Sequence, residues 1–442
     1  MIDLKLAMYL PFCQILQPGI FVTCGDDIET YCLESDLRDC ESLKTADVVA
    51  LAHPCDLKTA TYHGVYVLPD RSIKSDSVVV SECLEVLQKP SMQLMREKKA
   101  VVKNDLTTEE MVFSDSVFWM SAKAYVPLLS WYMEASLDSE LDAYAHFLPC
   151  LGLHMKNCDA TQFEGYKCQL LPLLRNLEFK VIVLNESKFY HLGTMEEYLA
   201  NFTECKSFGQ ELNLVKDTSN LSPCLKEYDD RRERILIASC FVSDRQQIAT
   251  AEGSRVILEW CVLQVPIFAS EDLILSNCIL RNCEGVKIVS ETLRFRGKFL
   301  YHTIPLRDKR GSAYVTVAFE INADMKRKSN DITCISIASV PLDKVIRECH
   351  LEEKRVLANR KPYSLWNLKL FRAGNSPEES FWNTFNLVDQ ILNWKDGTAH
   401  IQIELIPDLS WTLFSMEDVV EVKDLDVFLT DRRKLIDLIN SD

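Results

Sequence analysis

Residues 256–286 read VILEWCVLQVPIFASEDLILSNCILRNCEGV, and their apolar side chains recur with a regular period. Six of them lie six residues apart without a break: Val256, Val262, Phe268, Ile274, Leu280 and Val286. A hexad of apolar residues is typical of a left-handed parallel β-helix, in which each face of a coil contributes one buried side chain. The alternative is a chance register in an apolar region that holds two or three ordinary strands. The hexads favour a short β-helix over residues 250–290.

Before this region, short apolar runs alternate with amphipathic ones. GIFVTCGDD (19–27) predicts a buried strand that ends in a polar turn at Gly25-Asp26-Asp27. Further strand candidates are ADVVALAHP (46–54), HGVYVLPD (63–70), SVFWMSA (116–122) and FKVIVLNES (179–187). AKAYVPLLSWYMEA (122–135) and SELDAYAHFLPCLG (139–152) have apolar residues at helical spacing. Strands that alternate with helices indicate an α/β fold, in which helices cover a sheet.

The length of 442 residues indicates two or three domains. We assign residues 1–225 to an α/β domain and residues 226–442 to a C-terminal domain that holds the β-helix and a mixed strand and helix region. This last region starts near residue 291 and includes the strand candidates SAYVTVAFEIN, ITCISIASV and AHIQIELIP. One helix start is explicit, because Ser376-Pro377-Glu378-Glu379 combines a capping serine, a first-turn proline and a glutamate three residues after the serine.

Composition excludes several classes of protein. The net charge of −16 repels a phosphate backbone, and the basic clusters MREKK, DRRER and MKRKS are too short for a nucleic-acid surface. No run of 18 apolar residues occurs, so we expect no membrane span, and MIDLKLAMYLPF does not have the form of a secretory signal. The 17 cysteines lack zinc spacing, since C-x-x-C is absent and the closest pair is Cys278 and Cys283. Their odd number and apolar surroundings indicate free thiols in a reducing cytoplasm.

Phosphate-binding loops of the usual kinds are absent from the sequence. All 13 glycines are isolated, so neither a Walker loop nor a G-x-G-x-x-G motif occurs. Two explanations remain open: the chain binds no triphosphate, or the binding loop lies outside this chain. The last third of the sequence contains no recognisable catalytic constellation.

The turn Gly25-Asp26-Asp27 is the first candidate site. Ligands of open α/β sheets bind beyond the carboxyl ends of the strands, and Mg²⁺ prefers one or two carboxylates together with substrate phosphate. The alternative is structural: the two aspartates would cap a helix that begins near Ile28.

Histidine and lysine flank two further strand patterns. His63-Gly64 leads HGVYVLPD, and Lys89-Pro90 follows SECLEVLQ (81–88). The Lys89 ammonium would act as a point charge toward a phosphate, whereas an isolated lysine ordinarily lies on the solvated surface. His53 and His63 are interpreted as structural rather than as part of a nucleophile site, because no G-x-S-x-G elbow occurs.

The stretch LNESKFYHLGTMEEYLA (184–200) joins a strand to a helix. Thr194-x-x-Glu197 is a capping box, so a helix begins there. Backbone N–H groups at such a terminus, behind Gly193, suit an anionic or hydroxyl-rich ligand. In SELDAYAHF, by contrast, Glu140 and Asp142 would point to different faces of a helix, which argues against a paired acid and base.

The order of these segments is more informative than each one alone. Gly25-Asp26, His63-Gly64-Val65, Lys89-Pro90, Asp115-Ser116-Val117-Phe118 and FYHLGTMEEYL, followed by hexads, resemble the sugar-nucleotide pyrophosphorylases. LKLAMYLPFCQILQPGIFVTCGDDIETY, LAHPCDLKTATYHGVYVL, QKPS, SELDAYAHFL, LNESKFYHLGTMEEYL and SLWNLKLF are similar to segments of one branch, the fucose-1-phosphate guanylyltransferase (GDP-L-fucose pyrophosphorylase) family. The resemblance extends from the first residues to beyond Trp366. It implies a Rossmann-like nucleotidyltransferase domain, then a left-handed parallel β-helix and a strand-rich C-terminal region.

The resemblance also implies a reaction, in which GTP and L-fucose 1-phosphate give GDP-L-fucose and pyrophosphate in the presence of Mg²⁺. Asp26 is then the expected metal ligand and catalytic residue, and Lys89 is the expected catalytic partner of the sugar phosphate. The residues expected to line the sugar pocket are His63, Gly64, Asp115 and Asp142, while His191, Gly193 and Thr194 would close it from the far side of the sheet.

Two departures from the wider family matter. Other pyrophosphorylases often carry an aspartate, a second metal ligand, where this chain has His191, so we expect His191 to contact sugar or phosphate instead. The family's glycine-rich loop and its Lys/Arg signature should precede IDLKLAMYL, and the chain contains neither. We therefore expect an N-terminally shortened isoform or an incomplete gene model, whose activity has to be tested.

Two functions follow from these expectations. The first is a cytoplasmic guanylyltransferase. The second is a non-catalytic family member that binds a sugar nucleotide or a partner protein, with the β-helix as a surface for partners or for oligomerisation. A hexapeptide acyltransferase is set aside, because it needs a catalytic histidine in its coils and residues 253–290 contain none.

Overall fold

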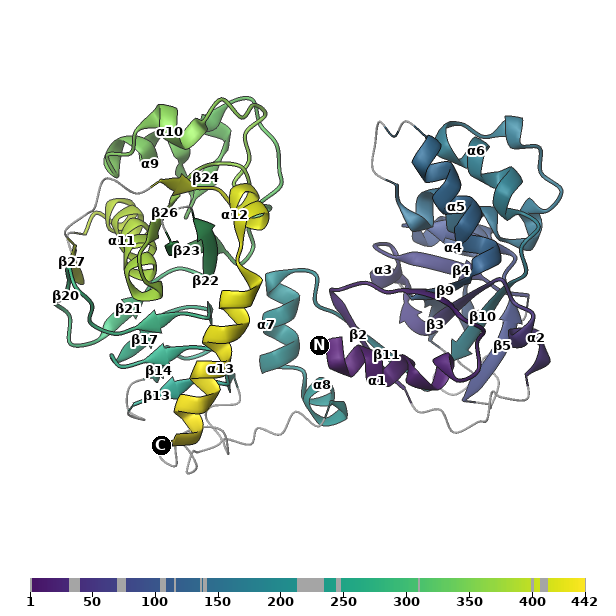
Figure 1. Cartoon of the computed structure of the whole chain (residues 1–442), viewed down its shortest axis with the longest axis horizontal. Helices are drawn as coiled ribbons and strands as arrows, with labels where there is room; N and C mark the ends of the chain where they lie inside the picture. Colours follow the sequence, from purple (N-terminus) through teal and green to yellow (C-terminus); the bar gives the residue numbers. More distant parts are fainter. Residues whose placement is uncertain are drawn as a thin grey trace. The chain divides into compact units, whose positions relative to one another are not determined.

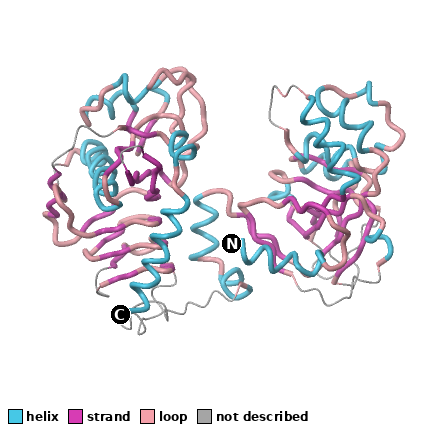
Figure 2. The backbone as a smooth tube through the Cα atoms, in the orientation of Figure 1, coloured by secondary structure: helices cyan, strands magenta, loops and turns pink. Residues whose placement is uncertain are grey.

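A computed structural model of the chain describes residues 2–31, 40–69, 77–103, 109–114, 117–135, 137, 141–212, 234–243, 248–308, 311–398, 401–405 and 412–441. The fold is mixed α/β and divides into two compact units, Met1–Gly193 and Thr194–Asp442, each with its own sheets (Figures 1 and 2). This division lies earlier than the boundary we expected between residues 225 and 226. The reason is that helix α7 (Met195–Thr203) packs on strands of the second unit.

The first unit is built on a nine-stranded sheet. Its strands are β1 (Gly19–Val22), β3 (Val48–Asp56), β4 (Gly64–Val67), β5 (Val78–Glu82), β6 (Glu85–Gln88), β7 (Val102–Lys103), β8 (Glu110–Ser114), β9 (Phe118–Ser121) and β10 (Phe179–Leu184). Its helices are α1 (Ile2–Cys13), α2 (Glu41–Lys44), α3 (Leu57–Ala60), α4 (Met92–Glu97), α5 (Ala122–Glu134) and α6 (Gly165–Leu174), with 3₁₀ turns η4 (Leu153–Met155) and η5 (Ala160–Gln162).

Strand β3 is the centre of this sheet and is buried on both faces. Val48, Ala50 and Ala52 belong to one hydrophobic cluster, whereas Val49 and Leu51 belong to another. Alternation along a strand sends successive side chains to opposite faces, so VVALA fills both layers of the unit. Among the described pairs of the sheet, only β3 and β10 run parallel. The strand pairing therefore does not confirm the expected Rossmann-like domain, and this assignment stays a prediction.

The strands predicted for the first unit are found at the expected places, with one correction to burial. GIFV forms β1, but β1 lies at one end of the strand order, and Ile20 and Val22 are exposed. We expected this strand to be buried because its residues are apolar. Apolarity alone does not tell a central strand from an edge strand, since burial is decided by pairing.

The segment SELDAYAHFLPCLG does not form the predicted α-helix within its described residues. It forms a π-helical turn, η2 (Ala143–Phe147), followed by a 3₁₀ turn, η3 (Leu148–Cys150). The Asp142 carboxylate accepts hydrogen bonds from the N–H groups of Tyr144 and Ala145, so it starts the turn. Pro149 lies in η3 and has no N–H, so it could not donate an α-helical hydrogen bond at this position.

The second unit contains a three-sided parallel coil (Figure 2). Each turn places one strand in each of three sheets: β12 (Ile235–Ala238), β15 (Val256–Glu259) and β18 (Leu273–Ser276); β13 (Phe241–Val242), β16 (Val262–Leu263) and β19 (Ile279–Leu280); and β14 (Ile248–Thr250), β17 (Ile267–Ala269) and β21 (Leu293–Phe295). All pairs within these sheets are parallel. The coil thus begins before the predicted start near residue 250, and its left-handedness stays a prediction.

The six-residue repeat predicted for the coil is wrong. Val256 pairs with Leu273, not with Ile274, so one turn is a residue shorter than three hexads. Val256 and Leu280 consequently lie in the interior core, whereas Ile274 packs in a separate cluster beneath Leu199 of α7. Val286 lies in β20 (Val286–Ile288), which pairs antiparallel with β27 (Ile403–Leu405) outside the coil. The apolar region is buried on both faces of its strands, and this produced the apparent six-residue period.

The rest of the second unit continues from the coil. Strand β22 (Phe299–Asp308) extends the β12–β15–β18 sheet by pairing parallel with β18. The sheet then continues with the antiparallel strands β23 (Gly311–Glu320), β26 (Phe371–Gly374) and β28 (Leu413–Phe414). The remaining elements are α8 (Lys206–Glu211), η10 (Ile332–Cys334), β24 (Ser336–Ile337), β25 (Val340–Pro341), α9 (Leu342–Glu348), α10 (Glu353–Leu357), α11 (Pro377–Asp396), α12 (Met416–Val422) and α13 (Leu425–Ser441). ITCISIASV, predicted as strand, is mostly η10 and the short hairpin β24–β25.

Two predicted helix starts are confirmed. Thr194 and Glu197 form the reciprocal capping box of α7, and Ser376 caps α11 with Pro377 in the first turn. No helix among the described residues is both long and apolar enough to cross a membrane. All cysteines that the structure describes are free thiols.

A buried ion pair attaches α7 to the coil. The Arg255 guanidinium contacts the Asp272 carboxylate at 2.7 Å and Glu196 of α7 at 2.7 Å, and the Arg255 and Asp272 side chains are only 11% and 5% exposed. Burial would raise the pKa of Asp272, but hydrogen bonds from Arg255 and Lys298 outweigh it and lower the pKa to about 2. The pair therefore holds α7 against β15 and β18.

We predict that Asp272→Ala destabilises this part of the second unit by about 3 kcal/mol, because it leaves a buried guanidinium with less compensation. Hydrogen exchange of α7 and β15, read by mass spectrometry, should become faster. Glu252→Ala, on an exposed turn, is the control and should exchange like the wild type. Unchanged exchange in Asp272→Ala would contradict the role of the ion pair.

The stability from Asp272 should also depend on pH. The folded pKa of about 2 lies below the ordinary value of 3.8, so the ionised carboxylate stabilises the folded state above about pH 4. This contribution is lost as the pH falls through the folded pKa. In urea unfolding, the difference between the wild type and Asp272→Asn should be full near neutral pH and should shrink below about pH 4. A difference that grows on acidification would show that another group dominates.

Candidate functional site

Two short strands bring together motifs that are far apart in the sequence. β2 (Asp27–Thr30) follows the GDD turn, and β11 (Lys188–His191) contains FYH. The strands pair antiparallel with His191 opposite Asp27, and the Leu192 N–H donates to the Asp26 carbonyl at 2.6 Å. Because Asp27 begins a strand, the alternative that the aspartates cap a helix near Ile28 is wrong.

Helix α1 fixes the loop that leads into β2. The Lys5 ammonium donates to the Thr23 hydroxyl at 3.1 Å, to the Cys24 carbonyl at 2.7 Å and to the Asp27 carboxylate. The Lys5 and Asp27 side chains are 11% and 1% exposed. A buried carboxylate of this kind requires a paired cation. Asp27 therefore serves to hold the loop in place.

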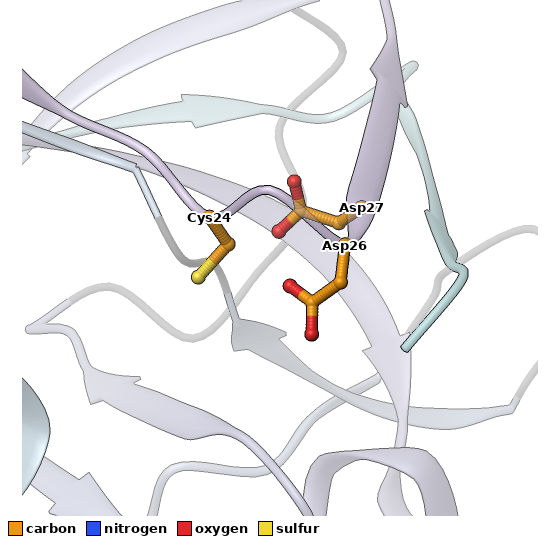
Figure 3. Close-up of side chains that lie close together, drawn as sticks. All are labelled: Cys24, Asp26 and Asp27. Atoms are coloured by element: carbon orange, nitrogen blue, oxygen red, sulfur yellow. The ribbon is translucent and has the colours of Figure 1, made fainter. Parts of the chain in front are cut away.

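Asp26 is the carboxylate of this turn that faces solvent. Its side chain is 54% exposed, and its Oδ2 lies 3.6 Å from Nε2 of His191. Figure 3 shows Cys24, Asp26 and Asp27 close together where the loop enters β2. The two neighbouring aspartates thus differ in environment, since Asp27 forms a buried ion pair with Lys5 and Asp26 is exposed to solvent.

Gly193 is required by the closeness of Asp26 and His191. A Cβ at this position would lie 2.5 Å from Cε1 of His191 and 2.9 Å from Oδ2 of Asp26. Real Cβ atoms do not approach other atoms so closely, so a side chain at residue 193 would push the carboxylate or the imidazole away. Steric exclusion of a side chain therefore explains why residue 193 of FYHLGT is glycine.

The donor set around Asp26 fits a hard divalent cation with few protein ligands. Potential ligand atoms of Cys24, Asp26 and Asp27 lie within 4.8 Å of one another. Asp27 is held by Lys5, and a thiol is a poor ligand for Mg²⁺. One solvent-facing carboxylate remains, which agrees with the habit of Mg²⁺ to bind one or two carboxylates, waters and substrate phosphate.

His63 adds a second imidazole beside His191. The two rings meet edge to face with centroids 5.1 Å apart, and His63 also meets Phe189 of β11 at 5.2 Å. The Lys89 backbone N–H donates to the His63 carbonyl at 3.0 Å, and Lys89 has the left-handed φ of 42°. Lys89 is exposed at the end of β6, next to the start of β4. Side-chain contacts therefore link Asp26, His191 and His63, and Lys89 is joined to His63 through its backbone N–H.

Gly64 and Asp142 form an adjoining part of the same region. A Cβ at Gly64 would overlap the ring of Tyr144, so only glycine permits this close approach. Gln88, the partner of Gly64 in the β4–β6 pairing, donates from Nε2 to the Asp142 carboxylate at 3.0 Å. Asp142 thus connects the end of β6 to the π-helical turn that carries Tyr144.

Two predicted site residues, Asp115 and Thr194, are not assigned to this set. Asp115 and Glu140 fall outside the described residues. Thr194 belongs to the second unit, where its hydroxyl is engaged in the capping box with Glu197.

His53 is part of the core, as the structural interpretation of this residue anticipated. It is buried, and its Nδ1 lies 2.6 Å from the Ser187 hydroxyl. Burial lowers the pKa of His53 to about 4, although the Glu29 and Asp27 carboxylates act in the opposite direction. The imidazole is therefore neutral at physiological pH.

Sequence reasoning missed Lys5, Tyr144 and Phe189. Lys5 carried a usable signal, because it is a lone charge in the apolar helical run LKLAMYL. Such a charge requires a buried partner or an exposed position. Tyr144 and Phe189 looked like ordinary apolar positions, and their placement follows from long-range packing.

Chemically, this arrangement offers a carboxylate for a cation, two imidazoles and an exposed ammonium for an anion. These are groups that bind a phosphorylated ligand with its metal ion. Sequence comparison points to the same class. The sequence profile of the fucose pyrophosphorylase domain matches residues 1–375.

Two relatives are similar over almost the whole chain. A human fucose-1-phosphate guanylyltransferase is 28% identical over 471 aligned positions, which cover 98% of this chain and 73% of the human protein. A mouse fucose-1-phosphate guanylyltransferase is 26% identical, with 100% of this chain and 76% of the mouse protein covered. The chain belongs to the fucose pyrophosphorylase family.

We predict that Gly193→Ala separates Asp26 from His191, because the new methyl group needs the space between them. In a crystal structure of the variant, the distance between Oδ2 of Asp26 and Nε2 of His191 should exceed its present 3.6 Å. Gly209→Ala is the control, since a Cβ there meets nothing within 4 Å. A variant with both side chains unmoved would disprove the steric role of Gly193.

Proposed function

We propose that this chain transfers a guanylyl group from GTP to L-fucose 1-phosphate. A phosphate oxygen of the sugar phosphate forms the new bond to the α-phosphorus of GTP, and the bond from that phosphorus to the bridging oxygen of the β-phosphate breaks. GDP-L-fucose and pyrophosphate are the products. The match to the family over residues 1–375 and the names of the two relatives support this reaction.

The observation that supports the proposal is that Asp26 lies beside His191, His191 lies beside His63, and the Lys89 backbone is bonded to His63, all at the ends of strands. All four residues were selected from the sequence by their resemblance to this family. Phosphoryl transfer requires little covalent chemistry from the protein, so positioning and charge stabilisation account for most of the rate.

Asp26 would hold Mg²⁺ through its solvent-facing carboxylate. When bound, the ion would neutralise charge on the phosphates and orient them. Asp26 is suited to this because Lys5 and Asp27 hold one side of its loop, and the Leu192 N–H holds the Asp26 carbonyl. A ligand on a fixed loop loses little freedom when the ion binds.

Lys89 would bind the phosphate of the sugar substrate. Its ammonium is a compact point charge, and its backbone is fixed by the hydrogen bond to His63 and by a left-handed φ. The flexible side chain can follow the phosphate as its oxygen attacks. This charge would contribute most where negative charge gathers at the reacting phosphorus.

His63, Gly64, Asp142 and His191 would line the sugar pocket, with Asp115 as a further candidate. The ring of Tyr144, packed against Gly64, supplies an apolar surface of the kind that C–H groups of a sugar ring contact. Gly193 would close the pocket, as the resemblance implies.

The same proposal includes a specific fold for each unit and a location in the cell. They are a Rossmann-like nucleotidyltransferase domain in the first unit, a left-handed β-helix in the second unit, binding of GTP, and a cytoplasmic location. The parallel β3–β10 pair and the three parallel sheets of the coil support the two fold assignments. The free thiols among the described cysteines support a reducing compartment.

Release of pyrophosphate from GTP, with L-fucose 1-phosphate and Mg²⁺ present, tests the reaction. Asp26→Asn and Lys89→Met should each lower kcat/KM by about 100-fold or more, because each removes a charge that stabilises the transition state. Asp437→Asn and Lys395→Met are controls at exposed positions of α13 and α11 and should keep full activity.

Absence of turnover in the wild-type chain would refute the reaction. If such a chain still bound GDP-L-fucose in titration calorimetry, it would be a non-catalytic binding protein of the same family. Full activity in Asp26→Asn and Lys89→Met would refute the assignment of the site.

A further inference from the structure

The second unit has a cavity of about 660 Å³ between α13 and the outer face of the sheet β13–β16–β19. Figure 1 shows α13 running alongside the coil. Ligand pockets usually have volumes between about 300 and 1,000 Å³. This cavity is lined only by residues of the second unit, so it is separate from the Asp26 region of the first unit.

Arg432 of α13 is a cation in the lining of this cavity. Its guanidinium lies between two aromatic rings, 4.5 Å from the centroid of Trp260 and 4.4 Å from the centroid of Phe428. Its Nε donates to Oδ1 of Asn277 at 2.9 Å. The rings and this hydrogen bond fix the plane of the guanidinium, so its orientation is set before any ligand binds.

Arg432 makes no ion pair within the described part of the chain. The other cations of the lining do: Arg281 pairs with Glu378 at 2.5 Å, and Lys434 pairs with Asp431 at 3.2 Å. Burial lowers the pKa of Arg432, while the charge of Glu259 raises it. Glu259 itself accepts hydrogen bonds from Tyr198 and Ser276. The remaining guanidinium N–H groups of Arg432 can therefore receive an anion.

The floor of the cavity is apolar and flat. Phe241, Val262 and Ile279 occupy matching positions in β13, β16 and β19, so their side chains stack as a ladder on the outer face of the sheet. Besides Asn277, two further carboxamides line the cavity, those of Gln264 and Asn375. A carboxamide both donates and accepts hydrogen bonds, which suits the edge of a nucleobase better than an acyl chain.

We propose that this cavity is a second ligand site that binds a nucleoside phosphate. Arg432 binds the phosphate through its guanidinium fork, a geometry that matches two phosphate oxygens. The base lies on the ladder Phe241–Val262–Ile279, and Gln264 and Asn375 contact its edge. The site goes beyond the proposed function, because it does not use any residue assigned to guanylyl transfer.

Equilibrium dialysis of the full chain with GDP tests the site by stoichiometry. If both the proposed function and this inference hold, the wild type binds two equivalents of GDP. Over the same range of GDP concentration, Arg432→Gln then binds one equivalent. If only the second site exists, the wild type binds one equivalent and Arg432→Gln none. Affinity at the second site should fall by about tenfold to hundredfold in Arg432→Gln, since hydrogen bonds to a charged group are lost.

Two further variants locate the effect and exclude misfolding. Arg433→Gln alters the neighbouring exposed arginine of α13 and should bind GDP like the wild type. Gln264→Glu is isosteric and lies on the sheet side of the cavity, so it should weaken GDP binding by charge repulsion without disturbing α13. Equal stoichiometry and affinity in the wild type, Arg432→Gln and Gln264→Glu would overturn the proposal.

The choice of probe tests the class of ligand. GMP should occupy the site as GDP does, whereas inorganic phosphate and guanosine should each bind at least about tenfold more weakly, because each makes only half of the contacts. Inorganic phosphate that binds as tightly as GDP, or decanoate that displaces GDP, would overturn the assignment to a nucleoside phosphate.

Discussion

The pairing of β2 with β11 is the constraint on which the candidate site depends. It sets the GDD turn opposite FYH and places Asp26 beside His191. The loop before β2 is held on one side by Lys5 and on the other by the Leu192 N–H. Gly193 permits the close approach, and any larger residue would occupy the same space as the Asp26 and His191 side chains. The exposed carboxylate therefore stands on a rigid support, as catalytic and metal-binding groups require.

In the second unit, the main constraint is that helices have to cover the outer faces of the coil. Strands of two to four residues cannot bury enough surface alone, so stacked turns need cover on their outer faces. Helix α7 covers one face through Leu199, which packs with Ile257 and Ile274, and the Arg255–Asp272 pair ties the helix down. Helix α13 lies along another face without filling the space beneath it. The cavity at Arg432 is the result.

Much of the local structure could be predicted from the residues themselves. Val48–Ala52 predicted a strand because β-branched and apolar residues favour a pleated, buried position, and Thr194 and Ser376 predicted helix starts because their hydroxyls cap backbone N–H groups. These signals act between neighbours in the chain. They failed where a distant partner decided the outcome: β1 became an exposed edge strand, and the hexads slipped by one residue in the turn from β15 to β18.

The sequence by itself determined the family, the positions of most strands and two helix caps, and the choice of Asp26, His63 and His191 as candidates, because order and residue type are properties of the chain alone. The tertiary structure decided which of two adjacent aspartates pairs with a buried lysine and which faces solvent. It also decided that Arg432 lies between two rings without a carboxylate partner in the described residues. Charge and burial at these positions depend on strand pairing and helix packing between residues far apart in the chain, and no local pattern records those distances.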